Sequence, residues 1–430
     1  MRAEGAIGPA ASLGIPNFRW LWLGTVFSSI GQWMQQVVLG WVVYDLTGSG
    51  TILGGVNGVR SVAMLGFGPF AGVFIDRADA KRVMVVVSLF LMALSALMGV
   101  LLFTDLIEVW HIFLFMFAFG LAQVLDQPLR ATMTFLLVPP RLAPNAMALN
   151  TAAMSSTRAL GPGVGGALLP LIGAAGAFFA QAASYLFATL TRFMIAFPER
   201  EQAQRRDSPL QNLKDGVHFV ATARYTRAFL LLNLTAPVLL IPIFTALTPI
   251  YAKDVFESNE TGLGLLVAMV GVGGVLGAAT VAALGSFERR GLLEIVALFG
   301  FSAGLFGFSF AAELWQGLLL MLFTGFAEQV FLLTNMTMLQ LTVPNRMRGR
   351  VSSLMMLGFG LMPIGALAAG AGSDAIGPQA ITRIMAGAGG LIAVLLLLAA
   401  PIVRNATLSH MMRLHAEANE DAGQTAPAEA

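Results

Sequence analysis

Four ionisable side chains stand out within long apolar stretches of the sequence: Arg60, Asp126, Arg158 and Glu328. Charges in such stretches need a partner or a watery cavity, and they commonly mark a substrate or proton pathway. Glu328 falls near the middle of its stretch, so we expect it to exchange a proton near neutral pH or to bind a cationic substrate. A structural hydrogen bond is the alternative. Arg60 and Arg158 could each neutralise an anionic substrate or pair with a buried acid, and Arg158 could equally tie two helices together.

Asp126 has a partner within reach in its own helix. It precedes Arg130 by four residues, the acid-before-base order that favours a helical ion pair. Both residues fall near one end of their apolar stretch. We therefore expect a local pair or a cytoplasmic gate here, and not a proton site at the middle of the membrane.

The first apolar stretch carries a polar stripe. Ser28, Gln32 and Gln35 are spaced by four and three residues, with Gln36 beside them. Residues at these spacings share one face of a helix. A lone glutamine would usually make a packing hydrogen bond, whereas this stripe predicts the wall of a polar cavity.

The composition determines which elements position these side chains. Of 430 residues, 57% are hydrophobic and only 11% are charged, and the mean hydropathy is +0.78. Soluble domains carry about 25% charged residues. Soluble enzymes, nucleic-acid-binding proteins and disordered scaffolds are therefore disfavoured, and we expect the lipid bilayer to surround the chain. The absence of cysteine excludes disulfides, thiolate metal sites and a cysteine nucleophile.

Twelve apolar segments are long enough to cross a bilayer, which predicts an all-α membrane protein with twelve transmembrane helices. The predicted spans are 20–44, 52–75, 83–104, 110–130, 146–171, 175–197, 229–251, 262–285, 292–312, 315–339, 351–372 and 380–402. The N-terminal segment lacks a basic region leading into an apolar core and a cleavage site, so we expect no cleaved signal peptide.

The basic residues predict the orientation of these spans. All but four of the 25 lysine and arginine residues fall on one side, including Arg192. Lys253 and Arg383 fall on the other side, and Arg60 and Arg158 lie within spans. This asymmetry predicts a multi-pass protein of the cytoplasmic membrane with both termini in the cytoplasm.

An offset of 205 residues aligns the two halves of the chain. Ala63, Met64, Gly66, Gly68 and Gly72 match Ala268, Met269, Gly271, Gly273 and Gly277, and Gln123 matches Glu328. The pairs run in the same direction, which predicts two parallel-repeat six-helix bundles around a central cavity. We expect an N-terminal half at 1–197, a cytoplasmic linker at 198–228, a C-terminal half at 229–403 and a short cytoplasmic tail at 404–430.

The linker contains the start of a helix. Ser208 and Pro209 are typical of an N-cap and a first helical position, and Gln211 follows three residues after the cap. An apolar stripe then predicts an amphipathic helix lying along the membrane interface. The stripe is formed by Leu210, Leu213, Val217 and Val220.

The segment from Gly72 to Arg82 carries a known motif. It reads Gly-Val-Phe-Ile-Asp-Arg-Ala-Asp-Ala-Lys-Arg and resembles the cytoplasmic signature of the major facilitator superfamily, G-x-x-x-D-[RK]-x-G-[RK]-[RK], with Asp79 in place of the second glycine. The resemblance implies that Asp76 and Arg77 belong to a cytoplasmic latch between the halves. Because Asp79 replaces a glycine of the signature, the resemblance does not determine the turn geometry of this loop.

Three further stretches narrow the resemblance: Asp126-Gln127-Pro128, the segment from Arg158 to Gly166, and the segment from Val343 to Val351. They are similar to the transmembrane secretion effector branch, which includes siderophore and macrolide exporters. We assign Asp126, Arg130, Arg346, Arg348 and Arg350 to the cytoplasmic latch. We assign Glu328, Arg60, Arg158, Gln123, Gln32, Gln35, Gln36 and Ser28 to substrate binding or proton coupling.

Together these features predict a secondary exporter of a small amphipathic molecule, working by alternating access. The chain lacks the phosphate-binding pattern G-x-x-x-x-G-K-[ST], so we expect a proton gradient to supply the energy, with no cofactor and no metal. We expect a monomer, and neither enzymatic activity nor a nucleic-acid partner. A nutrient importer of the same fold and a non-transporting membrane sensor are the alternatives.

Overall fold

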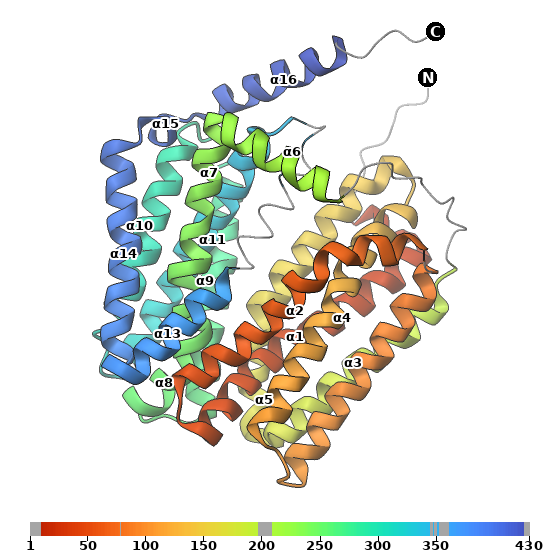
Figure 1. The fold of residues 1–430 in the computed structure, drawn as a ribbon, viewed down its shortest axis with the longest axis vertical. Helices are drawn as coiled ribbons and strands as arrows, with labels where there is room; N and C mark the ends of the chain where they lie inside the picture. Colours follow the sequence, from red (N-terminus) through yellow and green to blue (C-terminus); the bar gives the residue numbers. More distant parts are fainter. Residues whose placement is uncertain are drawn as a thin grey trace. The chain divides into compact units, whose positions relative to one another are not determined.

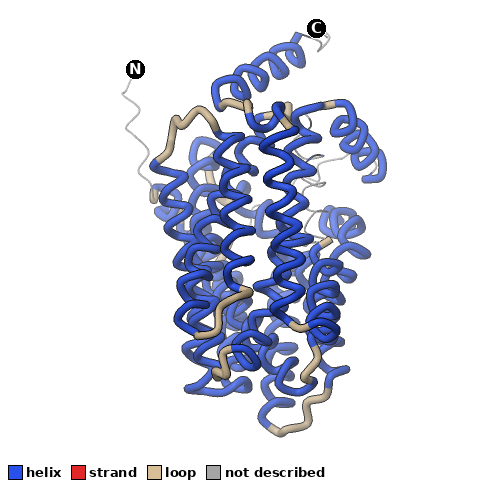
Figure 2. Tube along the Cα trace, turned by 90° about the vertical axis from the view of Figure 1, so that its left-hand side faces the viewer, coloured by secondary structure: helices blue, strands red, loops and turns tan. Residues whose placement is uncertain are grey.

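The computed structural model describes residues 10–77, 79–196, 209–344, 347, 351 and 361–424. Every regular element in these ranges is a helix, as Figures 1 and 2 show. Eight helical segments among them are long and apolar enough to cross a membrane. They are Ala80–Phe103, Val109–Leu136, Pro140–Met194, Arg224–Val255, Glu260–Ala283, Arg290–Phe308, Leu314–Leu341 and Pro378–Ala399. Predicted spans 1, 2 and 11 overlap further helices, and the count of twelve stays a prediction.

The chain divides into two compact units. Unit 1 comprises Met1–Gly48, Val59–Gln204 and Asn259–Ala268, and unit 2 comprises Ser49–Gly58, Arg205–Ser258 and Met269–Ala430. Helices α2 (Gly50–Arg77) and α9 (Glu260–Ala283) each begin in one unit and continue in the other.

In unit 1, helices α1 and α3 pack along the length of α5. Its elements are η1 (Ala11–Gly14), α1 (Pro16–Thr47), α3 (Ala80–Phe103), α4 (Val109–Leu136), η2 (Pro140–Leu142) and α5 (Ala143–Met194). Large apolar side chains fill one end of this bundle, among them Phe18, Leu21, Met84 and Leu129. Asp79 caps α3 by accepting from the backbone amides of Lys81 and Arg82, so the residue that departs from the family signature begins the next helix.

Helix α5 is interrupted at Gly173, where φ is 68° and ψ is 176°. Only glycine adopts such angles readily. The break falls between predicted spans 5 and 6, so one long helical element covers both predicted spans. The start of α9, up to Ala268, packs on α5 within unit 1. There Gly166 and Gly264 bring the two backbones so close that a side chain on either would overlap the other helix.

In unit 2, helices α10 and α14 pack together, and α10 also packs on α11. The helices are α6 (Pro209–Thr222), α7 (Arg224–Thr235), α8 (Thr248–Ile250), α10 (Arg290–Phe308), α11 (Leu314–Leu341), α13 (Met362–Ile376), α14 (Pro378–Ala399), α15 (Pro401–Arg404) and α16 (Leu408–Gln424). Two wide π-helical segments interrupt predicted span 7, η3 (Ala236–Leu240) and η4 (Ile243–Leu247), and a third, η5 (Tyr251–Val255), begins at its last residue. Pro237 lies in η3, Pro242 directly precedes η4, and Pro249 lies in α8 between η4 and η5; each removes a backbone donor from the regular pattern.

The linker helix is present as α6. Its Phe219 and Val220 contact the buried cluster of Val343, Met347 and Val351. Val217 of the predicted stripe is 52% exposed, and the placement of this helix along the membrane interface stays a prediction. Ser208 lies outside the described residues, and the side chains of Leu210 and Leu213 are likewise not described.

Candidate substrate and coupling site

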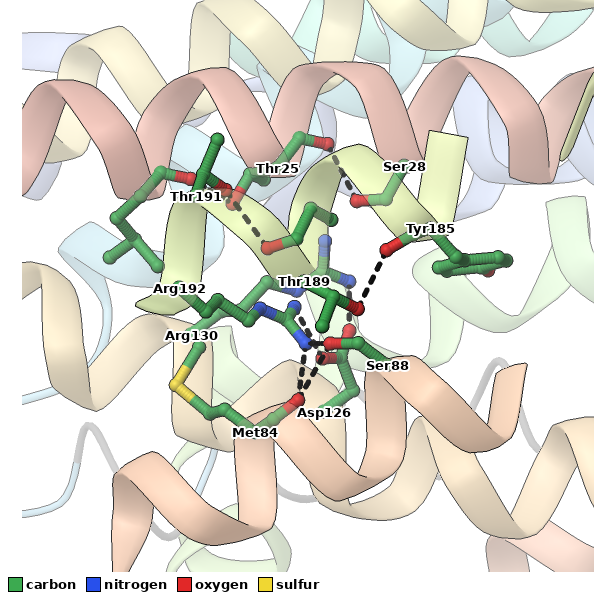
Figure 3. Close-up of polar contacts among 12 residues, drawn as sticks. Thr25, Ser28, Met84, Ser88, Asp126, Arg130, Tyr185, Thr189, Thr191 and Arg192 are labelled. Atoms are coloured by element: carbon green, nitrogen blue, oxygen red, sulfur yellow. Dashed lines mark hydrogen bonds and ion pairs between the residues drawn. The ribbon is translucent and has the colours of Figure 1, made fainter. Parts of the chain in front are cut away.

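A buried ion-pair cluster joins three helices of unit 1. Asp126 in α4 binds Arg130 one turn later, with Oδ2 2.8 Å from Nη2, so the ion pair predicted from the i,i+4 spacing is confirmed. Its other oxygen lies 2.9 Å from Nη2 of Arg192 in α5. Arg192 also donates to the Met84 carbonyl at 2.6 Å and to the Ser88 hydroxyl in α3. Figure 3 shows these side chains pointing toward one another.

Arg192 corrects an expectation from the sequence. Its position near the end of a predicted span led to its assignment among the cytoplasmic charges, but its side chain is only 4% exposed. The burial is tolerated because Asp126, Ser88 and a backbone carbonyl satisfy its donors. Its place within the apolar segment 175–197 was the signal that could have identified it.

Arg60 lies in unit 1 on α2 and is half-buried. Its guanidinium carbon lies 5.5 Å from the centre of the Phe119 ring in α4. The backbones also meet here, since a Cβ on Gly120 would lie 2.7 Å from the Arg60 carbonyl oxygen. Within the described part of the chain, no carboxylate pairs with this guanidinium.

Two buried polar groups lie near Arg60. Gln123 follows Gly120 by three residues on α4 and is 1% exposed, and its Oε1 has no hydrogen-bond partner among the described residues. Tyr185 of α5 is 3% exposed, its hydroxyl likewise has no partner among the described residues, and it lies near enough to Arg60 and to the Asp126 cluster for the charges of both to influence it. Tyr185 was not among the residues chosen from the sequence, because nothing in the spacing along the chain relates it to Arg60.

The polar stripe of α1 is only partly available to a cavity. Gln35 is 5% exposed, and its oxygen accepts from Gln181 of α5 while its amide contacts the Met116 sulfur. Ser28 is 3% exposed and donates to the Thr25 carbonyl of its own helix. Both side chains are therefore buried within unit 1, and their assignment to substrate binding or proton coupling stays a prediction.

The remaining members of the stripe, Gln32 and Gln36, are half-buried. Their assignment to a polar wall stays a prediction. Arg158 is half-buried as well, and its guanidinium carbon lies 5.9 Å from the centre of the Trp33 ring. A stacked arginine of this kind fits either role that the sequence left open.

Glu328 lies on α11 in unit 2 and is 3% exposed. The cytoplasmic latch residues are described less fully. Helix α2 ends at Arg77, but the side chains of Asp76 and Arg77 are outside the description, and Arg346, Arg348 and Arg350 lie outside the described residues. Their assignment to a latch stays a prediction.

Unit 2 contains a polar cluster that sequence reasoning missed. Glu294 of α10 is fully buried and accepts from the Asn335 amide of α11 at 2.7 Å, while its other oxygen has no partner among the described residues. Asn335 accepts in turn from Asn233 of α7 at 2.7 Å. Glu294 falls inside predicted span 292–312, so an acid within an apolar segment was the available signal.

A family model for transmembrane secretion effectors matches residues 7–426 of the chain. The chain belongs to this family of the major facilitator superfamily. It is 24% identical over 357 residues to the staphyloferrin A transporter of Staphylococcus aureus, covering 81% of this chain and 87% of that protein. It is 22% identical to macrolide efflux protein A of Streptococcus pyogenes, over 66% of this chain and 70% of the relative. An enterobactin exporter of Escherichia coli is 28% identical, over 45% and 46% of the two chains.

Solved structures agree on the fold of this secretion effector family member. The nucleoside transporter NupG matches with a TM-score of 0.68 and 14% identity, covering 89% of this chain and 98% of that one. A bacterial homologue of the human lysosomal transporter Spinster matches with a TM-score of 0.69 and 14% identity, covering 94% and 98%. The chain is therefore a multi-pass membrane transporter of the major facilitator type.

Proposed function

We propose that this protein is a secondary active exporter that moves a small amphipathic molecule out of the cytoplasm in exchange for protons. The observation that carries the proposal is the match of nearly the whole chain to the secretion effector family, whose relatives here include proteins named for macrolide efflux and enterobactin export. Twelve spans in two parallel six-helix halves, with both termini cytoplasmic, would give the alternating access that such a cycle needs.

Glu328 is our candidate for the proton-coupling group. It is a carboxyl buried within a membrane-length helix, and a proton carrier must be able to lose and regain its charge as its surroundings change. We propose that the cycle runs in a monomer and needs no bound cofactor.

Inverted membrane vesicles test both direction and energy source. With a radiolabelled siderophore as probe, an inside-acid gradient should drive accumulation, and a protonophore should abolish it. Absence of accumulation for macrolide and siderophore probes would contradict proton-driven export. Accumulation driven by the opposite gradient would favour the importer instead.

Glu328→Gln tests the coupling residue. The amide keeps the size of the side chain but cannot ionise, so we expect proton-driven accumulation to fall to background while the protein level is unchanged. Glu417→Gln, an exposed acid on α16, is the matched control and should transport as wild type does. Wild-type transport by Glu328→Gln would exclude this residue as the proton carrier.

A further inference from the structure

Arg60 is a permanent charge placed deep in the membrane span. By the helical rise of about 1.5 Å per residue, it lies about 12 Å below the start of predicted span 52–75. An arginine keeps its proton in proteins, so it cannot become neutral to relieve the cost of burial. Its position is also fixed, because α2 and α4 are in backbone contact at Gly120. The charge therefore needs either an anionic partner or a watery cavity.

Two other arginines of unit 1 show what a paired charge looks like here. Arg130 and Arg192 share the two oxygens of Asp126, and Arg192 makes further bonds to α3. Arg60 instead lies over the Phe119 ring, with its guanidinium carbon 5.5 Å from the ring centre. A contact of this kind does not occupy the N–H donors of the guanidinium with hydrogen bonds, and within the described residues no acid takes them.

The surroundings of Arg60 add donors and an apolar surface. The Gln123 amide and the Tyr185 hydroxyl can each donate one hydrogen bond or more, and each side chain has a buried oxygen without a partner in the described part of the chain. Buried polar groups are nearly always satisfied in a folded protein. Unsatisfied groups of two helices beside a cation of a third therefore indicate a site completed by a ligand.

We propose that Arg60, Gln123 and Tyr185 form a subsite for an anionic group of the transported molecule, a carboxylate or a similar planar oxyanion. This inference rests on the proposed transport function and names its substrate class. The edge of a guanidinium matches the two oxygens of a carboxylate, and Phe119 supplies an apolar surface for the adjoining part of the molecule. A cationic molecule would meet an uncompensated positive charge at the same place.

Chemical labelling of the purified full chain tests the subsite without a known substrate. Phenylglyoxal modifies accessible arginines, and peptide mass spectrometry identifies which ones react. We expect Arg60 to react and Arg192 to resist, because Arg192 is ion-paired. 2-Naphthoate at about ten times its dissociation constant should slow labelling of Arg60 roughly tenfold, because the bound anion covers the guanidinium, whereas neutral 2-naphthamide should not.

Variants give a second measurement. 2-Naphthoate should raise the melting temperature of wild type, and Arg60→Gln should lose this shift while Arg60→Lys keeps part of it. Arg413→Gln, an exposed arginine of α16, should respond as wild type does. Three results would each overturn the proposed subsite. Arg60 could fail to react with phenylglyoxal, 2-naphthamide could protect it as well as 2-naphthoate does, or Arg60→Gln could keep the full rise in melting temperature with 2-naphthoate. Because labelling requires no transport, loss of export with intact protection would contradict only the proposed export.

Discussion

At the residue scale, two arginines share one carboxylate at Asp126, so this buried cluster carries a net positive charge. Such a cluster depends on its acid more than on either arginine. Removing one partner of a buried pair leaves an uncompensated charge in a region of low dielectric constant. Asp126 therefore matters for the stability of unit 1, whatever part it plays in gating.

Asp126→Asn should destabilise the protein by on the order of 3 kcal/mol, because Arg130 and Arg192 both lose their counter-ion. Thermal unfolding of the purified protein in a single detergent measures the effect. Asp105→Asn is the matched control, since Asp105 is exposed and its φ of 54° suits asparagine equally well. If both variants had the same melting temperature as wild type, the charge of Asp126 would contribute nothing to stability.

Residue spacing could predict only the local part of this site. The Asp126–Arg130 pair lies within one helix, so its i,i+4 spacing was sufficient. Arg192 lies 66 positions after Asp126 in the sequence, and Tyr185 and Arg60 belong to different helices. Contacts of this kind depend on helix packing, which the spacing of residues along the chain does not encode.

At the scale of the helices, the start of α2 is capped by a side chain from α13. The Asp374 carboxylate accepts from the backbone amides of Gly50 and Thr51 at 2.7 and 2.9 Å and from the hydroxyls of Ser49 and Thr51 at 2.9 and 2.6 Å. An acid at a helix N-terminus satisfies free amides and complements the helix dipole. All of these residues belong to unit 2, so the cap holds the first turns of α2 within that unit.

This cap should depend on pH. Partial burial alone would raise the pKa of Asp374, but hydrogen bonds from Thr51, Ser49 and the Gly50 amide more than offset it and hold the pKa below its ordinary value. A lowered pKa in the folded state means that the stabilisation is present above the unfolded-state pKa of about 4 and is lost as the pH falls through the lower folded-state value.

Asp374→Asn should lower the free energy of unfolding by about 1 kcal/mol at neutral pH, because one accepting oxygen becomes an amide that cannot accept. Melting temperatures recorded from pH 7 down to 3 should show the two proteins converging in the acid range. A difference that stays constant over this range would mean that the charge of Asp374 does not stabilise the cap.

Gly173 provides a second prediction at this scale. Any other residue at its φ of 68° and ψ of 176° would be strained, so Gly173→Ala should cost on the order of 1–3 kcal/mol. Gly68→Ala is the control, because a Cβ there meets nothing within 4 Å. In thermal unfolding, the Gly68 variant should match or exceed wild type, and equal melting of the two variants would contradict the strain.

Hydropathy predicted the helical elements well and their internal geometry poorly. The gap between spans 5 and 6 corresponds to the break at Gly173, and spans 3, 4, 9 and 10 match α3, α4, α10 and α11 closely. The wide turns of span 7 were not predicted, although three prolines signalled them. Helix ends also differ, since capping and packing extend α1 to Pro16–Thr47 beyond the apolar segment 20–44.

At the scale of the whole molecule, composition alone predicted a membrane protein, and the family match confirms it. In the predicted topology most basic residues mark orientation, and few charges are left for chemistry. That is why the deep residues Arg60, Arg158 and Glu328 could be selected from the sequence. The division of α2 and α9 between two units could not be predicted from the sequence, because it arises from packing between distant segments.

The distribution of basic residues leads to a prediction about orientation. Few positive charges fall on the predicted outer side, so the loop before α11 should face the outside and α16 the cytoplasm. The chain contains no cysteine, so a single introduced thiol reports its own position without background. Ala312 and Ser409 are exposed positions in these two regions.

In intact cells, a membrane-impermeant maleimide should label Ala312→Cys and leave Ser409→Cys unmodified. Ser409→Cys should react only after permeabilisation, which also shows that its thiol is accessible. Labelling in the reverse order would place the termini outside. It would invert every sidedness assigned to the charges, including the cytoplasmic latch, while leaving the Arg60 subsite untouched, because that subsite depends on contacts within unit 1 and not on orientation in the membrane.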